Sequence, residues 1–396
     1  MSNRQKVKIA DIAEEIRVMY EPTKTERIPY VGLEHIEQQT LRLSSVGSSS
    51  EVQSTKKKFE SGDILFGTLR PYFRKVVRPK FSGVCSTDIS VIKAKSNTDQ
   101  AFLHYLIASQ EFISLANNSS NGTRMPRASW KVLLKAEWLM PQIDVQRQVG
   151  KILLAYDNLI ENNNRRIAVL EEMAQSLYRE WFVKFRFPGY ENVRFVDSKW
   201  GLVPEGWEIQ KLEALTEYIN RGVAPKYSDS AAQKVINQKC IRGFKLDLDL
   251  SRALGNKIAK EKLLKYGDIL INSTGVGTLG RVAQVLFTPV DTTVDSHITI
   301  VRPKRDVPIE FFGLCLESFQ PYFERLGEGA TGQTELKREL VGDALIIWPG
   351  QGLASIFANF VRPVRTLSYE LQMKNKNLKI QRDLLLPKLI SGNLQV

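Results

Sequence analysis

The sequence predicts an α+β fold in which two similar mixed α/β domains are separated by a pair of long antiparallel helices. Three observations indicate this coiled-coil arrangement and its pseudo-twofold internal repeat. One series of local patterns occurs twice, a heptad seam follows the first copy, and a weaker seam follows the second. The length of 396 residues also suits two domains better than one.

The repeat is anchored by a Gly-Asp turn before a short apolar strand. Gly62-Asp63 and Gly267-Asp268 stand 205 residues apart, and each strand runs into a loop that contains glycine and threonine. Alternating strands, a helical stretch, a second Gly-Thr loop and an apolar strand ending at Pro141 or Pro349 follow in both copies. A single Gly-Asp turn is ordinary, but five features in one order indicate a duplicated domain.

The segment after each copy carries the pattern of a long amphipathic helix. Apolar positions from Val149 to Trp181 recur at alternating steps of four and three, and Asn163 is the one polar member, a residue type that can fix helix register. A weaker seam runs from Leu353 to Leu385, with Lys374 and Gln381 at intervening positions, and Pro363 predicts a kink or a late helix start there.

Two such helices can bury each other as an antiparallel pair, and the alternative is that each packs on its own repeat. The residues expected at the helix-pair interface are Leu153, Tyr156, Ile160, Ile167, Leu170, Leu177, Val364, Leu367, Leu371, Leu378 and Leu385. The chain therefore divides into a first domain (1–142), a central long helix (143–188), a second domain (189–350) and a C-terminal long helix (351–396).

Composition limits the partners and the compartment. Fifty-six Lys and Arg against 43 Asp and Glu give a net charge of +13, which favours polyanionic partners but does not prove nucleic-acid binding. The three cysteines are far apart and lack metal-site spacing, which fits a reducing cytoplasm. Neither a membrane-spanning run nor a signal peptide is evident, so we expect a soluble cytoplasmic protein with no membrane partner.

Motifs of catalysis are weak or missing. Gly275 to Gly280 fits GxGxxG, but an alternating strand follows it where a dinucleotide site needs a helix, so a hairpin turn is favoured. Adjacent prolines, which the Pro-Pro motif of amino-methyltransferases requires, do not occur, and neither does a GxxxxGK[ST] phosphate loop. His35, His104 and His297 lack triad or metal spacing, and His104 fits packing in an apolar helix. We expect a non-catalytic chain without a bound cofactor or metal.

Three stretches resemble the specificity subunits of type I restriction-modification systems. They are GLVPEGWE from Gly201 to Glu208, the central-helix segment from Asp157 to Phe182, and LLPKLISG from Leu385 to Gly392. The resemblance covers essentially the whole chain, and the order of these strings relative to two repeats and two helices makes it specific. The first copy departs by lacking a VPEGW-like opening, which leaves its N-terminal boundary undefined.

The resemblance implies a function for each segment. Each copy would be a target-recognition domain that reads one half of a split sequence in double-stranded DNA, and the helices would be spacer regions that hold the halves at a fixed spacing. Two modification subunits would supply S-adenosylmethionine and adenine methylation, and restriction (motor-nuclease) subunits would use ATP and Mg²⁺ for cleavage. A protein-interaction scaffold, or a specificity subunit of a methylase-only system, is the alternative.

Base reading requires a few side chains on loops together with basic phosphate contacts. We expect Arg70, Arg74 and Arg124 to lie on the DNA side of the first domain, because they cluster near its loops. The full set of candidate DNA-binding residues is Lys57, Thr68, Arg70, Tyr72, Arg74, Lys75, Thr123, Arg124, Arg127, Lys226, Tyr227, Ser273, Thr274, Thr278, Arg281, Gln333, Lys337 and Arg338.

Overall fold

The computed structural model describes residues 4–120, 124–198, 201–228, 230–327 and 335–395. The chain forms two compact units. Unit 1 comprises Met1–Asn163 and Lys374–Val396, and unit 2 comprises Asn164–Met373. Each unit therefore joins one β-rich domain to part of both long helices.

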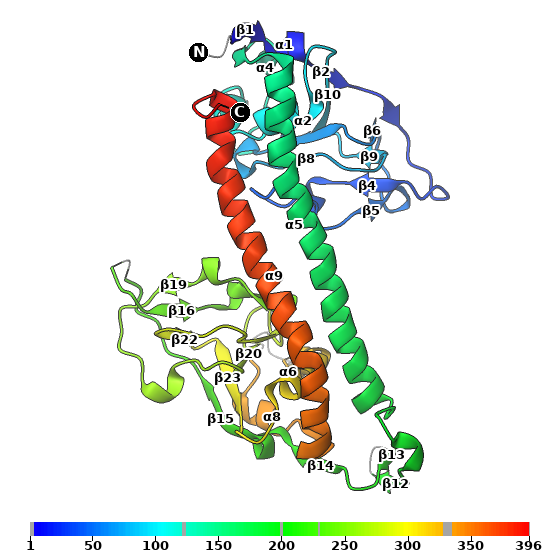
Figure 1. Cartoon of the computed structure of the whole chain (residues 1–396), viewed down its shortest axis with the longest axis vertical. Helices are drawn as coiled ribbons and strands as arrows, with labels where there is room; N and C mark the ends of the chain where they lie inside the picture. The colour runs from blue at the N-terminus through cyan, green and yellow to red at the C-terminus, as the bar shows by residue number, and fades with distance from the viewer. Residues whose placement is uncertain (1–3, 121–123, 199–200, 229, 328–334, 396) are drawn as a thin grey trace. The chain divides into compact units, whose positions relative to one another are not determined.

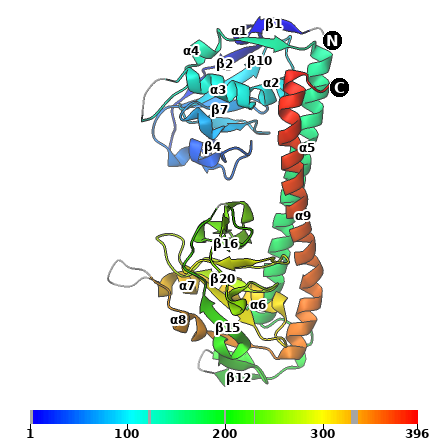
Figure 2. The same cartoon turned by 90° about the vertical axis from the view of Figure 1, so that its left-hand side faces the viewer.

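Unit 1 is built on a four-stranded antiparallel sheet in the order β2-β10-β7-β8 (Figure 2). Its strands are β2 (Ala13–Ile16), β7 (Ile64–Gly67), β8 (Val76–Val77) and β10 (Ile89–Ala94). A mixed sheet in the order β3-β6-β9-β4-β5 consists of β3 (Met19–Tyr20), β4 (Pro29–Val31), β5 (Gly47–Ser48), β6 (Lys56–Phe59) and β9 (Gly83–Cys85). The remaining elements are the pair β1 (Gln5–Lys8) and β11 (Glu137–Met140), and the helices α1 (Ile9–Ile12), α2 (Gln100–Ile107), α3 (Gln110–Asn118) and α4 (Trp130–Leu133).

Unit 2 repeats this plan with the order β15-β23-β20-β21. Its main strands are β15 (Thr216–Arg221), β20 (Ile269–Asn272), β21 (Val282–Gln284) and β23 (Ile298–Pro303). Smaller sheets are formed by β16 (Lys234–Ile236), β19 (Arg252–Ala253) and β22 (Thr292–Val294), by β17 (Ile241–Arg242) and β18 (Lys245–Leu246), and by β14 (Glu208–Lys211) and β24 (Leu345–Trp348). The short helices are α6 (Ile309–Ser318), α7 (Gln320–Leu326) and α8 (Arg338–Gly342).

The two sheets correspond strand by strand, which confirms the duplicated fold. In unit 1, β10 pairs with β7 so that Ile89 faces Gly67, and in unit 2, β23 pairs with β20 so that Ile298 faces Asn272. A parallel pair also recurs, β4 with β9 and β16 with β22. An additional hairpin, β12 (Phe195–Ser198) with β13 (Gly201–Pro204), lies beyond the end of the central helix in unit 2 (Figure 1). It contains part of the GLVPEGWE string, for which the first copy has no counterpart in sequence.

Both faces of each central sheet are covered, so its strands are buried more fully than alternation predicts. Ile64 and Phe66 of β7 join the helix-side core, whereas Leu65 between them joins the core shared with the mixed sheet. In unit 2, Ile269 and Leu270 divide in the same way. Side chains point alternately to opposite faces of a strand, and here both faces are apolar.

The segment from Gly275 to Gly280 is a hairpin connection, as the sequence predicts. Strand β20 pairs antiparallel with β21, and no helix starts after the glycines in this described segment. Gly275, Gly277 and Gly280 all have positive φ, at 98°, 71° and 81°, a region that glycine enters without steric cost.

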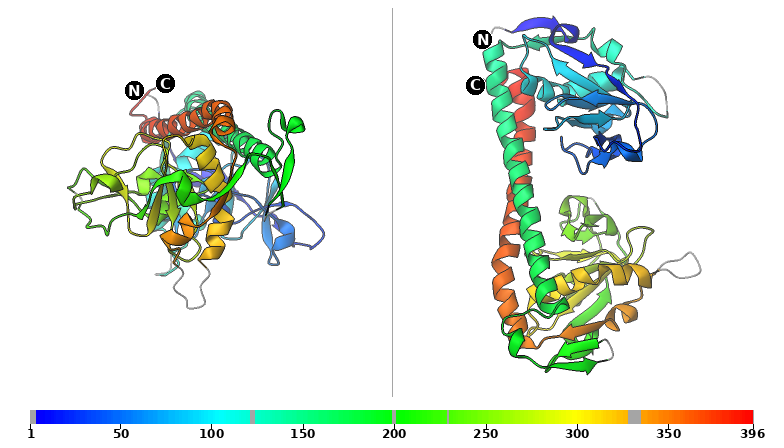
Figure 3. Two further views of the ribbon diagram at one scale, coloured as in Figure 1. Left: turned by 90° about the horizontal axis from the view of Figure 1, so that it is seen from below. Right: turned by 90° about the vertical axis from the view of Figure 1, so that its right-hand side faces the viewer.

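The long helices α5 (Ile143–Tyr178) and α9 (Gln351–Ser391) run antiparallel within each unit (Figures 1 and 3). In unit 1, Asn163 on α5 donates to Asn375 on α9 at 2.9 Å. In unit 2, Ser368 bonds to Glu171 at 3.3 Å, and the rings of Trp181 and Phe357 lie 5.5 Å apart. Trp181 stands in the π-helical turn Arg179–Val183 that ends the helix.

On α5 the expected seam is the buried face, with Leu153, Ile160 and Ile167 buried and Tyr156, Leu170 and Leu177 part-buried. On α9, Leu371 is buried, and Val364, Leu367, Leu378 and Leu385 are part-buried.

The true seam of α9 includes polar residues that the sequence pattern passes over. Ser368, Asn375 and Arg382 are buried there, whereas Lys374 and Gln381, expected at intervening seam positions, are exposed. At these two positions the predicted seam is one residue off, because the prediction followed apolar side chains only, and the buried polar groups are satisfied by partners on α5.

Pro363 does not delay the start of α9. The helix begins at Gln351 and continues through Pro363, so the predicted late start is wrong. Pro363 is exposed, and the carbonyl that loses its helical N–H partner there is the one four residues earlier.

His104 is a packing residue whose titration gives a testable pH dependence. It lies on α2 in the core of unit 1, and burial, reinforced by Arg78, Arg382 and Arg74, lowers its pKa to about 3. Its folded-state pKa is therefore below the unfolded value, so the folded state stays neutral while the unfolded chain takes up a proton. Stability is expected to be lost as pH falls from about 6.5 toward 3.

Between pH 7.5 and 5 the free energy of unfolding of unit 1 should fall by about 2 kcal/mol through this residue. The His104→Phe variant should lack this contribution to the pH dependence, whereas the pH effects that come from carboxyl groups should remain. Urea-dependent hydrogen exchange of α2 amides at the two pH values measures the difference, and equal pH slopes for both chains would contradict the assignment.

Candidate nucleic-acid interface

Three loops of unit 1 are bonded together at the end of β7. The Thr68 amide donates to the Asp88 carbonyl at 2.9 Å, and the Ala128 amide donates to the Thr68 carbonyl at 2.9 Å. Leu69 forms a β-bridge with Arg127, and the Arg70 amide donates to the Pro126 carbonyl at 2.8 Å. We name residues 68–70, 86–88 and 126–128 the three-loop frame of unit 1.

Unit 2 has the same frame at equivalent positions. The Ser273 amide donates to the His297 carbonyl at 2.8 Å, and the Leu336 amide donates to the Ser273 carbonyl at 2.8 Å. Thr274 bridges Glu335. Residues 273–275, 295–297 and 335–337 therefore form the three-loop frame of unit 2, whose two amide–carbonyl bonds and β-bridge match those of unit 1.

The side chains on the two frames differ. In unit 1, Arg127 pairs with Asp88, its NH2 lying 2.9 Å from Oδ1. In unit 2, the Thr274 hydroxyl lies 2.9 Å from His297 Nδ1, and Glu335 pairs with Arg221 at 2.7 Å. One backbone frame that carries different exposed polar groups can present two different chemical surfaces.

Several candidate cations of unit 1 are held inward by main-chain acceptors. Arg74 Nε donates to the Ala108 carbonyl at 2.6 Å, and burial lowers the pKa of Arg74. Lys57 Nζ donates to the Ile89 carbonyl at 2.9 Å, and Lys75 Nζ donates to the Leu33 carbonyl. The expectation that Arg74 lies on an exposed binding side therefore does not fit its position against the core.

Other candidates of unit 1 are exposed. Arg70, Tyr72, Arg124 and Arg127 are all exposed, and Arg70 has a positive φ of 50° in the turn after β7. Thr68 is part-buried, and its hydroxyl donates to the Asp88 carbonyl at 2.8 Å. Thr123 lies outside the described residues.

In unit 2, three candidates are bonded within the hairpin after β20 or to the neighbouring strand; Ser273 is buried, and Thr278 and Arg281 are part-buried. Ser273 is buried and its hydroxyl bonds to Thr299 at 2.6 Å, so it is not available to a base edge. Thr278 bonds to the Gly275 carbonyl at 3.2 Å, and Arg281 NH2 donates to the Gly277 carbonyl at 2.7 Å.

Four other candidates of unit 2, Lys226, Tyr227, Lys337 and Arg338, are exposed. Tyr227 is stacked under the guanidinium of Arg252, 3.4 Å from its ring centre, and Lys226 precedes it. Lys337 is exposed on the three-loop frame, and the neighbouring Arg338 bonds to Asn220 at 3.0 Å. Gln333 lies outside the described residues.

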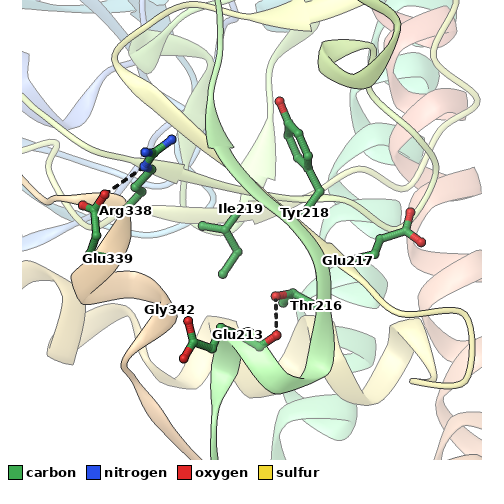
Figure 4. Close-up of a pocket in the computed structure, with 8 residues that line it drawn as sticks. All are labelled: Glu213, Thr216, Glu217, Tyr218, Ile219, Arg338, Glu339 and Gly342. Carbon is green, nitrogen blue, oxygen red and sulfur yellow. Dashed lines mark hydrogen bonds and ion pairs between the residues drawn. The ribbon is translucent and has the colours of Figure 1, made fainter.

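A shallow pocket of about 280 Å³ lies between β15 and α8 of unit 2 (Figure 4). Arg338 pairs with Glu339 at its rim, and the Thr216 hydroxyl donates to the Glu213 carbonyl at 3.1 Å. The Tyr218 hydroxyl is buried without a hydrogen-bond partner among the described atoms. The residues that line the pocket carry both positive and negative charges. The pocket adjoins the three-loop frame of unit 2 through Arg338, which follows Lys337 in the chain.

Sequence reasoning missed several polar residues of the frames. Asp88, His297 and Arg221 are absent from the predicted set, as is Gln238, whose Nε2 donates to the Thr274 carbonyl at 2.7 Å. The sequence did contain a signal for two of them, because Asp88 and His297 each come directly before the corresponding strand, β10 or β23. Aligning the two repeats residue by residue would have paired them.

Among the described residues, groups of three or more His, Cys, Asp or Glu side chains able to hold a metal are not found. In the same described ranges, helices long and apolar enough to cross a bilayer do not occur. The fold is a duplicated sheet domain with a three-loop frame on each copy.

Comparison with known proteins gives the family. A family model described as the type I restriction modification DNA specificity domain matches residues 1–172. The chain is 26% identical over 311 residues to the MjaIX specificity subunit of Methanocaldococcus jannaschii, which covers 76% of this chain and 71% of that protein. It is 23% identical over 412 residues to the HindI specificity subunit of Haemophilus influenzae, covering 86% and 88%.

The fold is shared with a solved structure. The S subunit of a type I restriction-modification system from M. genitalium aligns over 98% of this chain and 96% of its own, with a TM-score of 0.63 and 14% identity. The resemblance of the chain to type I specificity subunits is therefore confirmed.

Proposed function

We propose that this chain is the sequence-specific DNA-binding subunit of a type I restriction-modification complex, in which each unit reads one half of a bipartite target. The observation that carries the proposal is the duplicated three-loop frame, which presents different exposed side chains on matching backbones. Two different half-sites require such a pair of readers, since base identity is read by side chains on a fixed frame.

Charge supports the same function. The net charge of +13 provides the attraction to phosphates that any DNA-binding protein uses. Arg70 is an exposed cation on the frame of unit 1, Arg124 is an exposed cation two residues before its third loop, and Lys337 is one on the frame of unit 2. We assign these three to phosphate contacts that position the protein on the duplex.

The chain itself performs no catalysis in this proposal. Two modification subunits would bind S-adenosylmethionine and methylate adenine, and restriction subunits would use ATP and Mg²⁺, so this chain would bind double-stranded DNA and its partner subunits only. Such a complex would act in the cytoplasm. The weak or missing catalytic motifs in the sequence agree with a chain that binds DNA while its partner subunits carry out the reactions.

The test is methylation profiling of cellular DNA by single-molecule sequencing, with the chain produced together with its modification subunits. The expected result is methyladenine at a bipartite sequence with an unread spacer, lost when the chain is omitted. Methylation that is independent of the chain, or that follows no split sequence, would favour the protein-interaction scaffold.

A further inference from the structure

We propose that Arg127, oriented by Asp88, is the residue with which unit 1 reads a guanine in the major groove. The inference rests on the proposed function and adds a specificity-determining residue and the base that it meets. It follows from three features that coincide at Arg127: a fixed main chain, an orienting carboxylate and an exposed guanidinium.

The main chain at Arg127 is fixed from both sides. Arg127 bridges Leu69, the preceding Pro126 accepts from the Arg70 amide at 2.8 Å, and the following Ala128 donates to Thr68 at 2.9 Å. A side chain anchored in this way starts from a defined point, so it loses less conformational freedom when it meets a base edge.

Asp88 orients the guanidinium. Its Oδ1 lies 2.9 Å from Arg127 NH2, and its own main chain is held because its carbonyl accepts from both the amide and the hydroxyl of Thr68. The side chain of Arg127 is 57% exposed and that of Asp88 is 31% exposed. A guanidinium has five N–H donors, so one ion pair leaves donors for a ligand.

The other cations near this frame do not combine a fixed main chain, an orienting carboxylate and an exposed guanidinium. Arg74, Lys57 and Lys75 are bonded to main-chain carbonyls, as described above. Arg70 and Arg124 are exposed, but the described residues offer no hydrogen bond or ion pair to orient either side chain. Unoriented cations suit phosphate, whereas two parallel N–H donors held in one plane match O6 and N7 of guanine, the commonest specific contact in the major groove.

Stability does not account for the pair, because an exposed ion pair contributes little to the free energy of folding. The equivalent positions of unit 2 carry Glu335 and His297, and Glu335 is engaged by Arg221. This guanine contact should therefore belong to the half-site of unit 1 alone.

The experiment uses the complex of the full chain with its modification subunits, bound to the DNA target found by methylation profiling. Each guanine of the target is replaced in turn by 7-deazaguanine, which lacks N7, and by inosine, which lacks only the minor-groove amino group. We expect one guanine at which 7-deazaguanine weakens binding and inosine does not.

Arg127→Ala should abolish that sensitivity and reduce discrimination against other bases at the same position by roughly 5- to 150-fold. Arg127→Lys should not restore discrimination, because an ammonium lacks the planar fork of donors. Asp88→Asn should reduce discrimination with little change in the salt dependence of binding. Arg147→Ala is the matched control, since Arg147 also pairs with an aspartate, Asp144, at 3.1 Å, and is 64% exposed; it should leave every position unchanged.

An Arg127→Ala complex with the native sequence preference overturns the inference while leaving the proposed function intact. Equal weakening on all sequences, with a smaller salt slope, also overturns it and makes Arg127 a phosphate contact. A native complex that selects no split target refutes the proposed function itself.

Discussion

Replacing Arg382 by alanine should lower the free energy of unfolding of unit 1 by about 3–5 kcal/mol. Arg382 on α9 is 1% exposed and pairs through NH1 with Asp157 Oδ1 on α5 at 2.5 Å. Asp157 Oδ2 in turn accepts from the Tyr105 hydroxyl on α2 at 2.6 Å. Removing the guanidinium leaves a half-buried carboxylate without its cation and opens a cavity where the two helices meet the domain.

Urea-dependent hydrogen exchange of α2 and α5 amides in the full-length chain measures this loss. Lys388→Ala, at an exposed position of the same helix, is the control and should change stability by no more than about 0.5 kcal/mol. The pair Arg382→Met and Asp157→Leu should recover part of the stability, because apolar groups can replace a buried ion pair, although the Tyr105 hydroxyl then loses its acceptor. Similar exchange for Arg382→Ala and the control would contradict the assignment.

The largest effect in unit 2 is expected from Phe357→Ala, which should destabilise that unit by about 3–5 kcal/mol. Phe357 is fully buried, and its ring centre lies 4.8 Å from that of Phe182, 5.5 Å from that of Trp181 and 6.2 Å from that of Tyr178. These aromatic residues join the end of α5 to the start of α9, so the cavity would open at the base of the helix pair.

Phe360→Ala provides a matched control one turn away. Its ring lies 5.9 Å from that of Trp181, but the side chain is 59% exposed. The expected cost is therefore well below that of Phe357→Ala. Thermal unfolding followed by hydrogen exchange of β20 and α6 amides distinguishes the two, and equal losses would contradict the packing described for Phe357.

The sequence predicts the architecture well because the architecture is repeated. Gly-Asp turns at Gly62 and Gly267 both precede a buried central strand, and the α5 seam from Val149 to Trp181 is buried along its length with part-buried members between. Because the fold is duplicated, each sequence pattern can be looked for in both copies. A pattern that arises by chance in one copy is not expected at the same place in the other.

The polar seam residues of α9 and the position of Arg74 escaped prediction for a common physical reason. Arg382 and Asn375 are polar, and only their partners Asp157 and Asn163 make them tolerable in a buried seam. Arg74 likewise reads as a surface cation in the sequence, yet it bonds to the carbonyl of Ala108. Burial of a polar group depends on a partner far away in the chain, which local pattern does not reveal.

The interleaved composition of unit 1 has a consequence for synthesis. Unit 2 is one continuous stretch, Asn164–Met373, whereas unit 1 needs Lys374–Val396 to complete its core, in which Leu386, Leu389 and Ile390 are buried beside Phe102 and Leu153. During translation, unit 2 can therefore fold before unit 1. Until residues 374–396 are made, unit 1 has an incomplete core with exposed apolar side chains. The usual order, in which the N-terminal domain folds first, is reversed in this topology, so early chaperone engagement should concentrate on the first 163 residues.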